Sequence, residues 1–557
     1  MASAPETQQL GKQSCATHDV TNQPPPLTPY DASDDAALLE GMEREGAGWA
    51  VEEVRRLGAR AGGEEAQRWG ELANTVEPVL RTHDRYGNRI DEVEFHDSWH
   101  QLTRVAVESG ATGAAWLDER PGAHVARYGA LLTWGHTEAG HGCPMAMTYA
   151  VIPALRHQPD LAEVYTPLLA SRFYDPGLRV PTEKRGLLAG MGMTEKQGGS
   201  DVRTNTTIAE PTAEEGVYTL RGHKWFTSAP MCDLFLVLAQ APGGLSCFLV
   251  PRVLPDGSRN TFRIQRLKDK LGNRSNASSE PEFDGTVAWR VGPEGRGVKT
   301  IIEMVNCTRL ECVAGSATLM RKALVEAGHH VRHRSAFGAR LIDQPLMRNV
   351  LADLALESEA ATTLTMRLAG AADRAARGDE GEQAFRRLAT AVGKYWVTKR
   401  TPPFTAEALE CLGGNGYVEE SGMPRLYREA PLNSVWEGSG NVNALDVLRA
   451  LAKEPAAVQA LMDELALARG ADARLDAAVA ELWSDLSDMA GVQMRARRVV
   501  ERMALALQGS LLVRHAPAAV SDAFCATRLG GEGGLAFGTL PRGADLDGIL
   551  DRARIPG

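Results

Sequence analysis

The chain has 557 residues, more than one hydrophobic core normally holds, so several domains are expected. Hydrophobic residues make up 43% and charged residues 24% of it, which is typical of a globular protein and excludes a disordered one. With 61 Lys and Arg against 71 Asp and Glu, the net charge is −10, which disfavours non-specific binding to nucleic acid or to anionic membranes.

The N-terminal segment, residues 1–33, is expected to be an extension. Residues 1–26 carry no basic start followed by an apolar run, so no secretory signal is expected and a cytoplasmic location is predicted. The eight cysteines form no C-x-x-C pair and lack zinc-ligand spacing, which favours reduced thiols and no metal. The most apolar stretch, 234–250, is interrupted by Ala-Pro-Gly-Gly at 241–244, a turn signal typical of two strands rather than of a membrane span.

The periodicity of the apolar residues changes along the chain and predicts an α+β fold in segregated blocks. Residues 34–185 are mostly helical, and 186–293 switch to short strands separated by Gly, Pro and Asp turns. Helices return over 294–452, with a break at Arg377-Gly378-Asp379, and a further helical segment covers 453–557 and contains a Gly-rich stretch at 529–538. No G-x-G-x-x-G motif joins a strand to a helix, so a doubly wound nucleotide-binding fold is not expected. The predicted strands are 217–220, 234–240, 247–250 and 262–267.

The first chemical motif is Met-Thr-Glu-Lys-Gln-Gly-Gly-Ser-Asp at 193–201. Its paired glycines allow backbone N–H groups to approach a ligand, and its hydroxyls can donate to a phosphate or a ring edge. The alternative is an ordinary turn at the start of the β block.

The second motif, Arg-Gly-His-Lys-Trp-Phe-Thr-Ser at 221–228, places an indole two residues before a hydroxyl, on the same side of a strand. A planar ring could stack there, although a half-buried strand aromatic is the alternative. The third motif combines Arg334 and Phe337 with Gln344 at a helix end, where the alternative is a solvated arginine cap.

The fourth motif, Trp-Glu-Gly-Ser-Gly-Asn at 436–441, sets a carboxylate between a Trp and a Gly-rich loop that leads into a helix. Burial against Trp436 would raise the pKa of Glu437 and make it a better base near neutral pH. The alternative is a carboxylate that stabilises the N-terminus of the helix expected over 441–451.

The four motifs, in this order across an α–β–α layout, resemble those of the acyl-CoA dehydrogenase superfamily. From about His18 onward the chain more narrowly resembles the AidB-type alkylation-response branch. That likeness rests on Asn-Gln-Pro-Pro-Pro-Leu at 22–27, Glu-Phe-His at 94–96 with Trp99 and His100, Arg-Gly-Leu-Leu at 185–188, and the run at 267–278. The implied fold is an N-terminal helical domain, a middle β-barrel or sandwich, a C-terminal helical bundle and an additional helical domain.

The resemblance implies FAD as the cofactor and a homotetramer as the assembly. Within one subunit, Trp225 would pack on the isoalloxazine ring, Thr227 would hydrogen-bond near N5, and Thr194 with Ser200 would bind the ring edge and the pyrophosphate. Arg334, Phe337 and Gln344, together with the motif at 412–417, would reach the FAD of a neighbouring subunit. The implied FAD positions are Thr194, Gly199, Ser200, Trp225, Thr227, Ser228, Arg334, Phe337, Gln344, Gly413, Gly414, Ser439 and Asn441.

The resemblance implies that Glu437 is the catalytic base. Some relatives carry the base on an earlier helix, but Thr308 stands at that position here and cannot accept a proton at neutral pH. The implied reaction removes the α-proton of an acyl-CoA while a hydride passes from Cβ to flavin N5, and an electron-transfer flavoprotein would be the acceptor. Positioning both reacting groups would supply much of the acceleration.

The alternative function is a double-stranded-DNA-binding flavoprotein with little dehydrogenase activity, which protects DNA from alkylation. The segment 454–557 has no basic excess, with 11 Lys and Arg against 14 Asp and Glu. It nevertheless contains a local group of arginines spaced along one helix face, which could contact phosphates. The candidate DNA contacts are Arg449, Arg495, Arg498 and Arg528.

Overall fold

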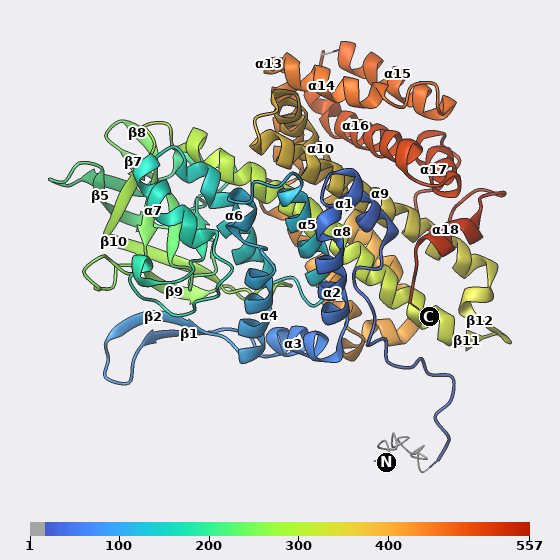
Figure 1. Ribbon diagram of the computed structural model, residues 1–557, viewed down its shortest axis with the longest axis horizontal. Helices are drawn as coiled ribbons and strands as arrows, with labels where there is room; N and C mark the ends of the chain where they lie inside the picture. The colour runs from blue at the N-terminus through green and yellow to red at the C-terminus, as the bar shows by residue number, and fades with distance from the viewer. Residues whose placement is uncertain (1–16, 489, 557) are drawn as a thin grey trace.

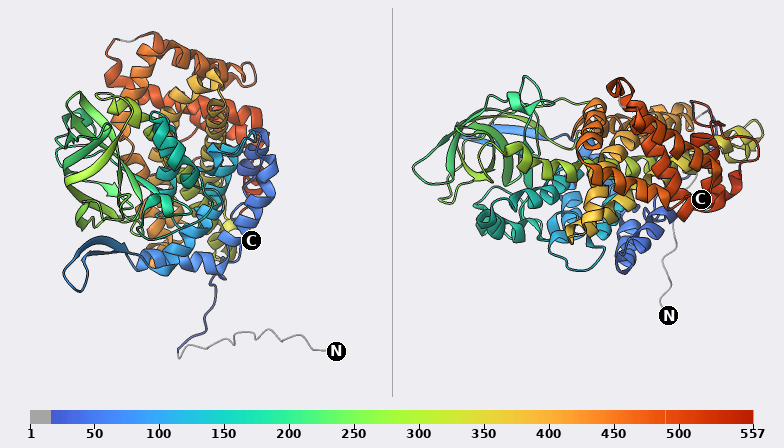
Figure 2. Two further views of the ribbon diagram at one scale, coloured as in Figure 1. Left: turned by 60° about the vertical axis from the view of Figure 1, so that its left-hand side comes forward. Right: turned by 90° about the horizontal axis from the view of Figure 1, so that it is seen from above.

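A computed structural model describes residues 17–488 and 490–556, so the first 16 residues of the predicted extension, which include Cys15, lie outside the described part. A β-rich unit stands at one end of the molecule and long helices fill the other (Figures 1 and 2). The predicted α+β architecture is therefore confirmed. The seven described cysteines are all free thiols.

The N-terminal part is helical except for one β-hairpin that the sequence reading did not identify. Its turn, 84–88, is closed by the Asp84 carboxylate, which accepts hydrogen bonds from the backbone N–H groups of Tyr86 and Asn88, and Gly87 supplies a φ of +87°. The elements are α1 (Ala36–Arg44), α2 (Val51–Ala61), α3 (Glu64–Thr75), β1 (Val79–His83), β2 (Arg89–Glu94), α4 (Asp97–Glu108), α5 (Ala123–Trp134), α6 (Gly142–Leu155) and α7 (Pro159–Leu169).

The middle part is a closed barrel. Strands β7, β4, β5 and β10 are hydrogen-bonded in that order, and β8 closes the ring because it pairs with both β10 and β7. Three predicted strands lie within β5, β7 and β8, and the fourth, 262–267, begins one residue before β9. The turn predicted at 241–244 joins β7 to β8. The strands are β3 (Ala189–Gly192), β4 (Ile208–Pro211), β5 (Val217–His223), β6 (Thr227–Ser228), β7 (Leu234–Ala241), β8 (Gly244–Pro251), β9 (Arg263–Leu267) and β10 (Ser278–Val291).

Three long helices form the centre of the C-terminal bundle, and the predicted break at 377–379 separates the second from the third. A small hairpin follows the first long helix at the edge of the molecule (Figure 1). The elements are α8 (Gly297–His333), β11 (Ser335–Ala336), β12 (Ala339–Arg340), α9 (Pro345–Ala376), α10 (Glu380–Glu410), α11 (Met423–Glu429), α12 (Leu432–Val435) and α13 (Gly440–Lys453).

Of the additional helices, α14 and α16 pack against α10, α16 also packs against α13, and α15 and α17 pack against α16 (Figure 1). Val499, Met503 and Leu507 of α16 belong to the same buried core as the bundle, so this segment shares its core with the bundle. A second core joins the remaining N-terminal helices to the barrel. The elements are α14 (Pro455–Ala466), α15 (Ala473–Ser487), α16 (Val492–His515), α17 (Ala518–Phe524) and α18 (Leu546–Arg552).

The last helix returns to the N-terminal part of the chain. The Arg552 guanidinium bonds the Glu40 carboxylate of α1 at 2.5 Å, and Arg321 of α8 donates to the carbonyl oxygen of Ala553 at 2.7 Å. Ile555 is buried and lies against Gly328 of α8. The C-terminal end of the described chain is thus fixed to α1 and α8.

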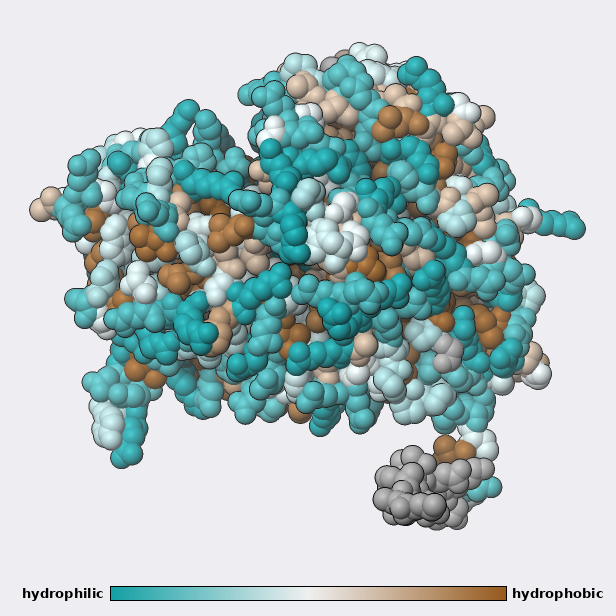
Figure 3. Space-filling model, in the orientation of Figure 1, coloured by the Kyte–Doolittle hydropathy of each residue, from teal (hydrophilic) through white to brown (hydrophobic). Residues whose placement is uncertain are grey.

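The surface of the face shown in Figure 3 is mostly hydrophilic, with apolar residues scattered over it. Within the described residues, no helix combines the length and the apolar character that a membrane span requires.

Candidate active site

Glu437 lies in the loop between α12 and α13 and is held there by two cationic side chains. The ammonium of Lys394, on α10, donates to the carbonyl oxygens of Trp436 at 2.8 Å and Gly438 at 2.5 Å. Arg309 Nε, on α8, donates to the Glu437 carbonyl oxygen at 3.2 Å. Glu437 itself has a φ of +58°, a left-handed conformation that costs roughly 1–2 kcal/mol for a residue with a side chain. These bonds offset that cost and fix the direction of the carboxylate.

The Glu437 carboxylate faces Thr308 of α8, whose hydroxyl donates to Oε2 at 2.8 Å. Burial raises the pKa of Glu437, while the Thr308 hydroxyl and the charges of Lys394 and Arg309 lower it in part. The direction of this shift agrees with the sequence-based expectation for Glu437. The hydrogen-bonding partner of the carboxylate is Thr308, and among the described residues no N–H group of α13 donates to it.

Thr308 has a role that its residue type alone did not suggest. It cannot take a proton, but its hydroxyl stabilises the ionised form of Glu437. Its neighbour Arg309 also pairs with Asp446 of α13 at 2.6 Å. The middle of α13 and the Glu437 loop are therefore tied to the same turn of α8.

The first two motifs lie together at the barrel. The backbone N–H of Trp225 donates to the carbonyl oxygen of Thr194 at 2.8 Å. Beneath them, Lys224 Nζ and Glu195 Oε1 form a fully buried ion pair at 2.7 Å. Lys224 also donates to the carbonyl oxygen of Leu238 on β7, so the pair fastens both motifs to the barrel wall.

The residues of these motifs fit a flavin. The Thr227 side-chain hydroxyl is buried, with 1% exposure for the residue, and has no hydrogen-bond partner within the described part of the chain. A buried hydroxyl normally finds a partner, so this one is consistent with a bound heteroatom. At Gly199, a Cβ would come within 2.5 Å of the Thr194 hydroxyl, so glycine leaves space beside that donor. Ser200 follows directly and is exposed.

Trp225 is half-buried and surrounded by cations. Lys268 Nζ lies 3.1 Å from the centroid of its ring, and Lys196 and Arg266 each lie 5.6 Å away. One face of the indole is therefore covered by an ammonium group in a cation–π contact. A stacked flavin would have to use the other face.

Cys143, at the start of α6, lies near both Ser228 on the barrel side of the site and Glu437. Burial raises the pKa of its thiol to about 11, and its surroundings include the Ser228 hydroxyl, the Asn276 amide and the charges of Glu437 and Lys270. Both polar atoms of the buried Asn276 side chain lack partners within the described residues. The sequence reading missed these contacts, although Lys270 and Asn276 belong to the run at 267–278 that carries the resemblance.

The third motif lies far from Glu437 of the same chain. Phe337, at the tip of the β11–β12 hairpin, is 100% exposed, and Gln344 donates to the Ala336 carbonyl oxygen at 2.8 Å. Arg334 donates to the carbonyl oxygen of Asn22 at 2.5 Å. From Thr308 to His333 at the end of α8 there are 25 residues, roughly 38 Å at 1.5 Å per residue. Gly413 and Gly414 lie in a separate exposed 3₁₀ turn at 413–417.

The arginines considered for DNA binding are mostly engaged with carboxylates. Of the four candidates, only Arg498 is exposed and makes no ion pair with a described residue. Arg528 is not a surface cation, because its side chain is mostly buried in the protein. The ion pairs are Arg449 with Asp446 at 3.1 Å, Arg495 with Asp488 at 3.1 Å, and Arg528 with Asp353 and with Glu357 at 3.3 Å.

A cavity of about 420 Å³ opens between α8, α10 and the start of α14, and Arg309 forms part of its wall. Arg386 and Arg387 also line it, and so does Thr390, whose hydroxyl is buried and has no partner among the described residues. Arg386 makes no ion pair within this part of the chain either. Glu303, Glu380 and Glu454 line it as well, so its wall carries three arginines and three glutamates. The unpaired Arg386 and the unsatisfied Thr390 hydroxyl lie in this cavity, next to the residue that holds the Glu437 loop.

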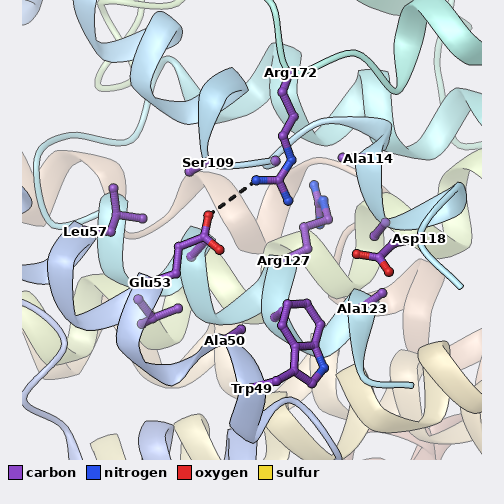
Figure 4. A pocket seen from close by; sticks show the side chains of 15 residues that line it. Trp49, Ala50, Glu53, Leu57, Ser109, Ala114, Asp118, Ala123, Arg127 and Arg172 are labelled. Atoms are coloured by element: carbon purple, nitrogen blue, oxygen red, sulfur yellow. Dashed lines mark hydrogen bonds and ion pairs between the residues drawn. The ribbon is translucent and has the colours of Figure 1, made fainter. Parts of the chain in front are cut away.

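A second cavity, between α2 and α5, is too small for a substrate. Its volume is about 30 Å³, which holds about one water molecule. Arg172 and Glu53 form an ion pair across it at 3.3 Å, and Trp49 lies at its other end (Figure 4).

Comparison with known proteins covers nearly the whole chain. Residues 22–176 match the family model "Adaptive response protein AidB N-terminal domain", and residues 190–286 and 295–452 match the middle and C-terminal domains of acyl-CoA dehydrogenase. AidB of Escherichia coli (strain K12) is 46% identical over 523 residues, which cover 93% of this chain and 96% of that protein.

Two solved structures have a similar fold. Caenorhabditis elegans ACDH-11, in complex with C11-CoA, is 26% identical with a TM-score of 0.79, over 99% of this chain and 94% of that one. An acyl-CoA dehydrogenase from Bacillus anthracis, complexed with FAD, has a TM-score of 0.64 and 18% identity over 82% of each chain, a likeness of fold alone.

Proposed function

Because the chain belongs to the AidB branch of the FAD-dependent acyl-CoA dehydrogenase family, we propose that Glu437 removes the α-proton of an acyl thioester. The Cα–H electron pair then forms the Cα–Cβ double bond as a hydride leaves Cβ. When bound, FAD supplies the hydride acceptor at N5. The single observation that carries this proposal is the Glu437 carboxylate itself, desolvated yet oriented by Thr308 and held by Lys394 and Arg309.

Residues of this chain would hold FAD at two places. The barrel side supplies Thr194, Ser200, Trp225 and Thr227, and the unpartnered Thr227 hydroxyl supports this assignment. The start of α13 supplies Ser439 and Asn441. The oriented hydroxyls and backbone N–H groups are what a flavin ring edge and a pyrophosphate require.

We propose a coenzyme A thioester as the substrate class, with the C11-CoA complex of the Caenorhabditis elegans relative as one support. The other support is Arg386, which has no ion pair among the described residues and lines the cavity beside Arg309, because coenzyme A carries several phosphate groups. Arg386 and the Thr390 hydroxyl would bind one of them. An electron-transfer flavoprotein would reoxidise the enzyme.

We also propose a homotetramer in which the β11–β12 hairpin completes the FAD site of a neighbouring copy. Phe337 is fully exposed and, with a φ of +52°, is presented at the tip of the hairpin. The length of α8 separates the hairpin from Glu437 of its own chain. An aromatic side chain held outside the fold in this way is suited to burial against a partner.

The proposal is tested by Glu437→Gln. The amide retains an acceptor for Thr308, and the bonds from Lys394 and Arg309 go to backbone carbonyls, so the loop should keep its place. A positioned base contributes roughly 10²–10⁴-fold to the rate, so bleaching of the flavin by acyl-CoA under anaerobic conditions should slow at least a hundredfold. FAD content should stay at the wild-type level. Bleaching at the wild-type rate in this variant would remove Glu437 from the role of base.

The alternative is a double-stranded-DNA-binding flavoprotein with little dehydrogenase activity. We favour the dehydrogenase, because Arg449, Arg495 and Arg528 are paired with carboxylates and only Arg498 is free among the described candidates. A panel of short, branched and long acyl-CoAs separates the two functions, since bleaching by none of them supports the DNA-binding alternative.

A further inference from the structure

Two cationic side chains without carboxylate partners flank the first turn of α13. Lys399 of α10 lies against Gly440, the first residue of that helix, because a Cβ there would come within 2.6 Å of Lys399 Cε. Its ammonium donates to the Ser434 hydroxyl at 3.2 Å. Within the described residues Lys399 has no ion pair, and burial together with the charge of Arg497 lowers its pKa.

Arg497, of α16, reaches the same turn from the additional helical segment. Its Nε donates to the Asn441 side-chain oxygen at 2.8 Å. The other two guanidinium nitrogens make no hydrogen bond to any described residue, and the side chain is exposed. Two other arginines of α16, Arg495 and Arg502, both pair with Asp485 of α15, whereas Arg498, like Arg497, has no ion pair among the described residues.

Two like charges side by side, without an acidic partner, raise the free energy of the folded protein. An anion between them would remove that cost, and the first turn of a helix adds unsatisfied N–H groups to the same place. The Ser439 side chain, at the N-cap, makes no capping hydrogen bond, so its hydroxyl is free as well.

We propose that Arg497 and Lys399 bind the pyrophosphate of FAD, the only anionic group of that cofactor. This inference rests on the proposed FAD site at Ser439 and Asn441. It adds a cofactor ligand from α16, which lies beyond the segment 295–452 that matches the dehydrogenase C-terminal domain. The additional helices would thereby contribute directly to cofactor affinity.

The test is the dissociation constant of FAD, measured by titrating deflavinated protein and following flavin fluorescence at several salt concentrations. A charge-assisted hydrogen bond contributes enough that Arg497→Ala should weaken FAD binding about tenfold to a hundredfold. Arg497→Lys should restore most of the affinity. The dependence of the affinity on salt should be weaker in Arg497→Ala than in the wild type, a change that a purely structural role would not produce.

Arg469→Ala is the matched control, because Arg469 is an exposed arginine of the same segment, three residues after α14, with no ion pair among the described residues. It should bind FAD as the wild type does. FAD affinity within twofold of the wild type in Arg497→Ala would overturn the proposal, as would an equal loss in Arg469→Ala or an unchanged salt dependence. Because the readout is cofactor binding, this result is independent of whether Glu437→Gln retains activity.

Discussion

Lys394→Met should slow the reaction, because it removes the side chain that holds the Glu437 loop while the Glu437 carboxylate itself stays unchanged. Methionine fills a similar volume but cannot donate to the carbonyl oxygens of Trp436 and Gly438, which the Lys394 ammonium now contacts at 2.8 and 2.5 Å. Hydrogen bonds from a charged donor contribute about 1.5–3 kcal/mol each, so the two bonds of Lys394 together stabilise the loop by at least about 3 kcal/mol. Since about 1.4 kcal/mol is tenfold in an equilibrium, the reactive loop conformation should become about a hundredfold less populated.

Rapid mixing of the enzyme with acyl-CoA under anaerobic conditions measures the consequence as the rate of flavin reduction, which should fall about a hundredfold. Loss of the Lys394 charge should also raise the Glu437 pKa, so that activity on the acid side is lost at a higher pH. Lys453→Met, an exposed site at the end of α13, is the control and should react normally. A Lys394→Met enzyme that binds FAD, melts at the wild-type temperature and reduces its flavin at the wild-type rate would refute the reasoning.

Two further variants probe the titrating carboxylates. In Thr308→Val the Glu437 pKa should rise, because the hydroxyl that stabilises the carboxylate is lost, and the acid limb of the pH–rate profile should move to higher pH; an unmoved limb would contradict this. Burial raises the pKa of Glu429 to about 7, so its contribution to stability is complete below its unfolded pKa of about 4.3 and is lost as the pH rises through about 7. Glu429→Gln cannot ionise and should melt higher than the wild type at alkaline pH but not at acidic pH; parallel melting curves across pH would argue against it.

The order of the blocks and the position of Glu437 could be predicted because both depend on local sequence. Apolar periodicity distinguishes helices from strands, and the Ala-Pro-Gly-Gly turn at 241–244 marks the hairpin between β7 and β8. The hairpin at 79–94 was missed because its strands are short and largely polar, although Asp84 and Gly87 carried a turn signal.

The partners of Glu437 could not be predicted because they are distant in sequence. Lys394 is 42 residues from Trp436 and Thr308 is 129 residues from Glu437, and no motif contains either pair. The ion pairs of Arg495 could not be predicted either, because its partners also lie outside its own helix, α16. A helix-face pattern shows which arginines share a side, but only the packing of α15 and α16 shows that Arg495 is paired with acidic residues.

The ion pair between Arg552 of α18 and Glu40 of α1 has a consequence for synthesis of the protein. Glu40 and Arg552 are 512 residues apart, and translation at about 5–20 residues per second needs roughly 25–100 s to cover that distance. Throughout that interval Glu40 of α1 lacks its ionic partner on α18. That ion pair therefore forms late in synthesis, whereas the apolar side of α1 can be covered earlier, when α5 and α9 have been made.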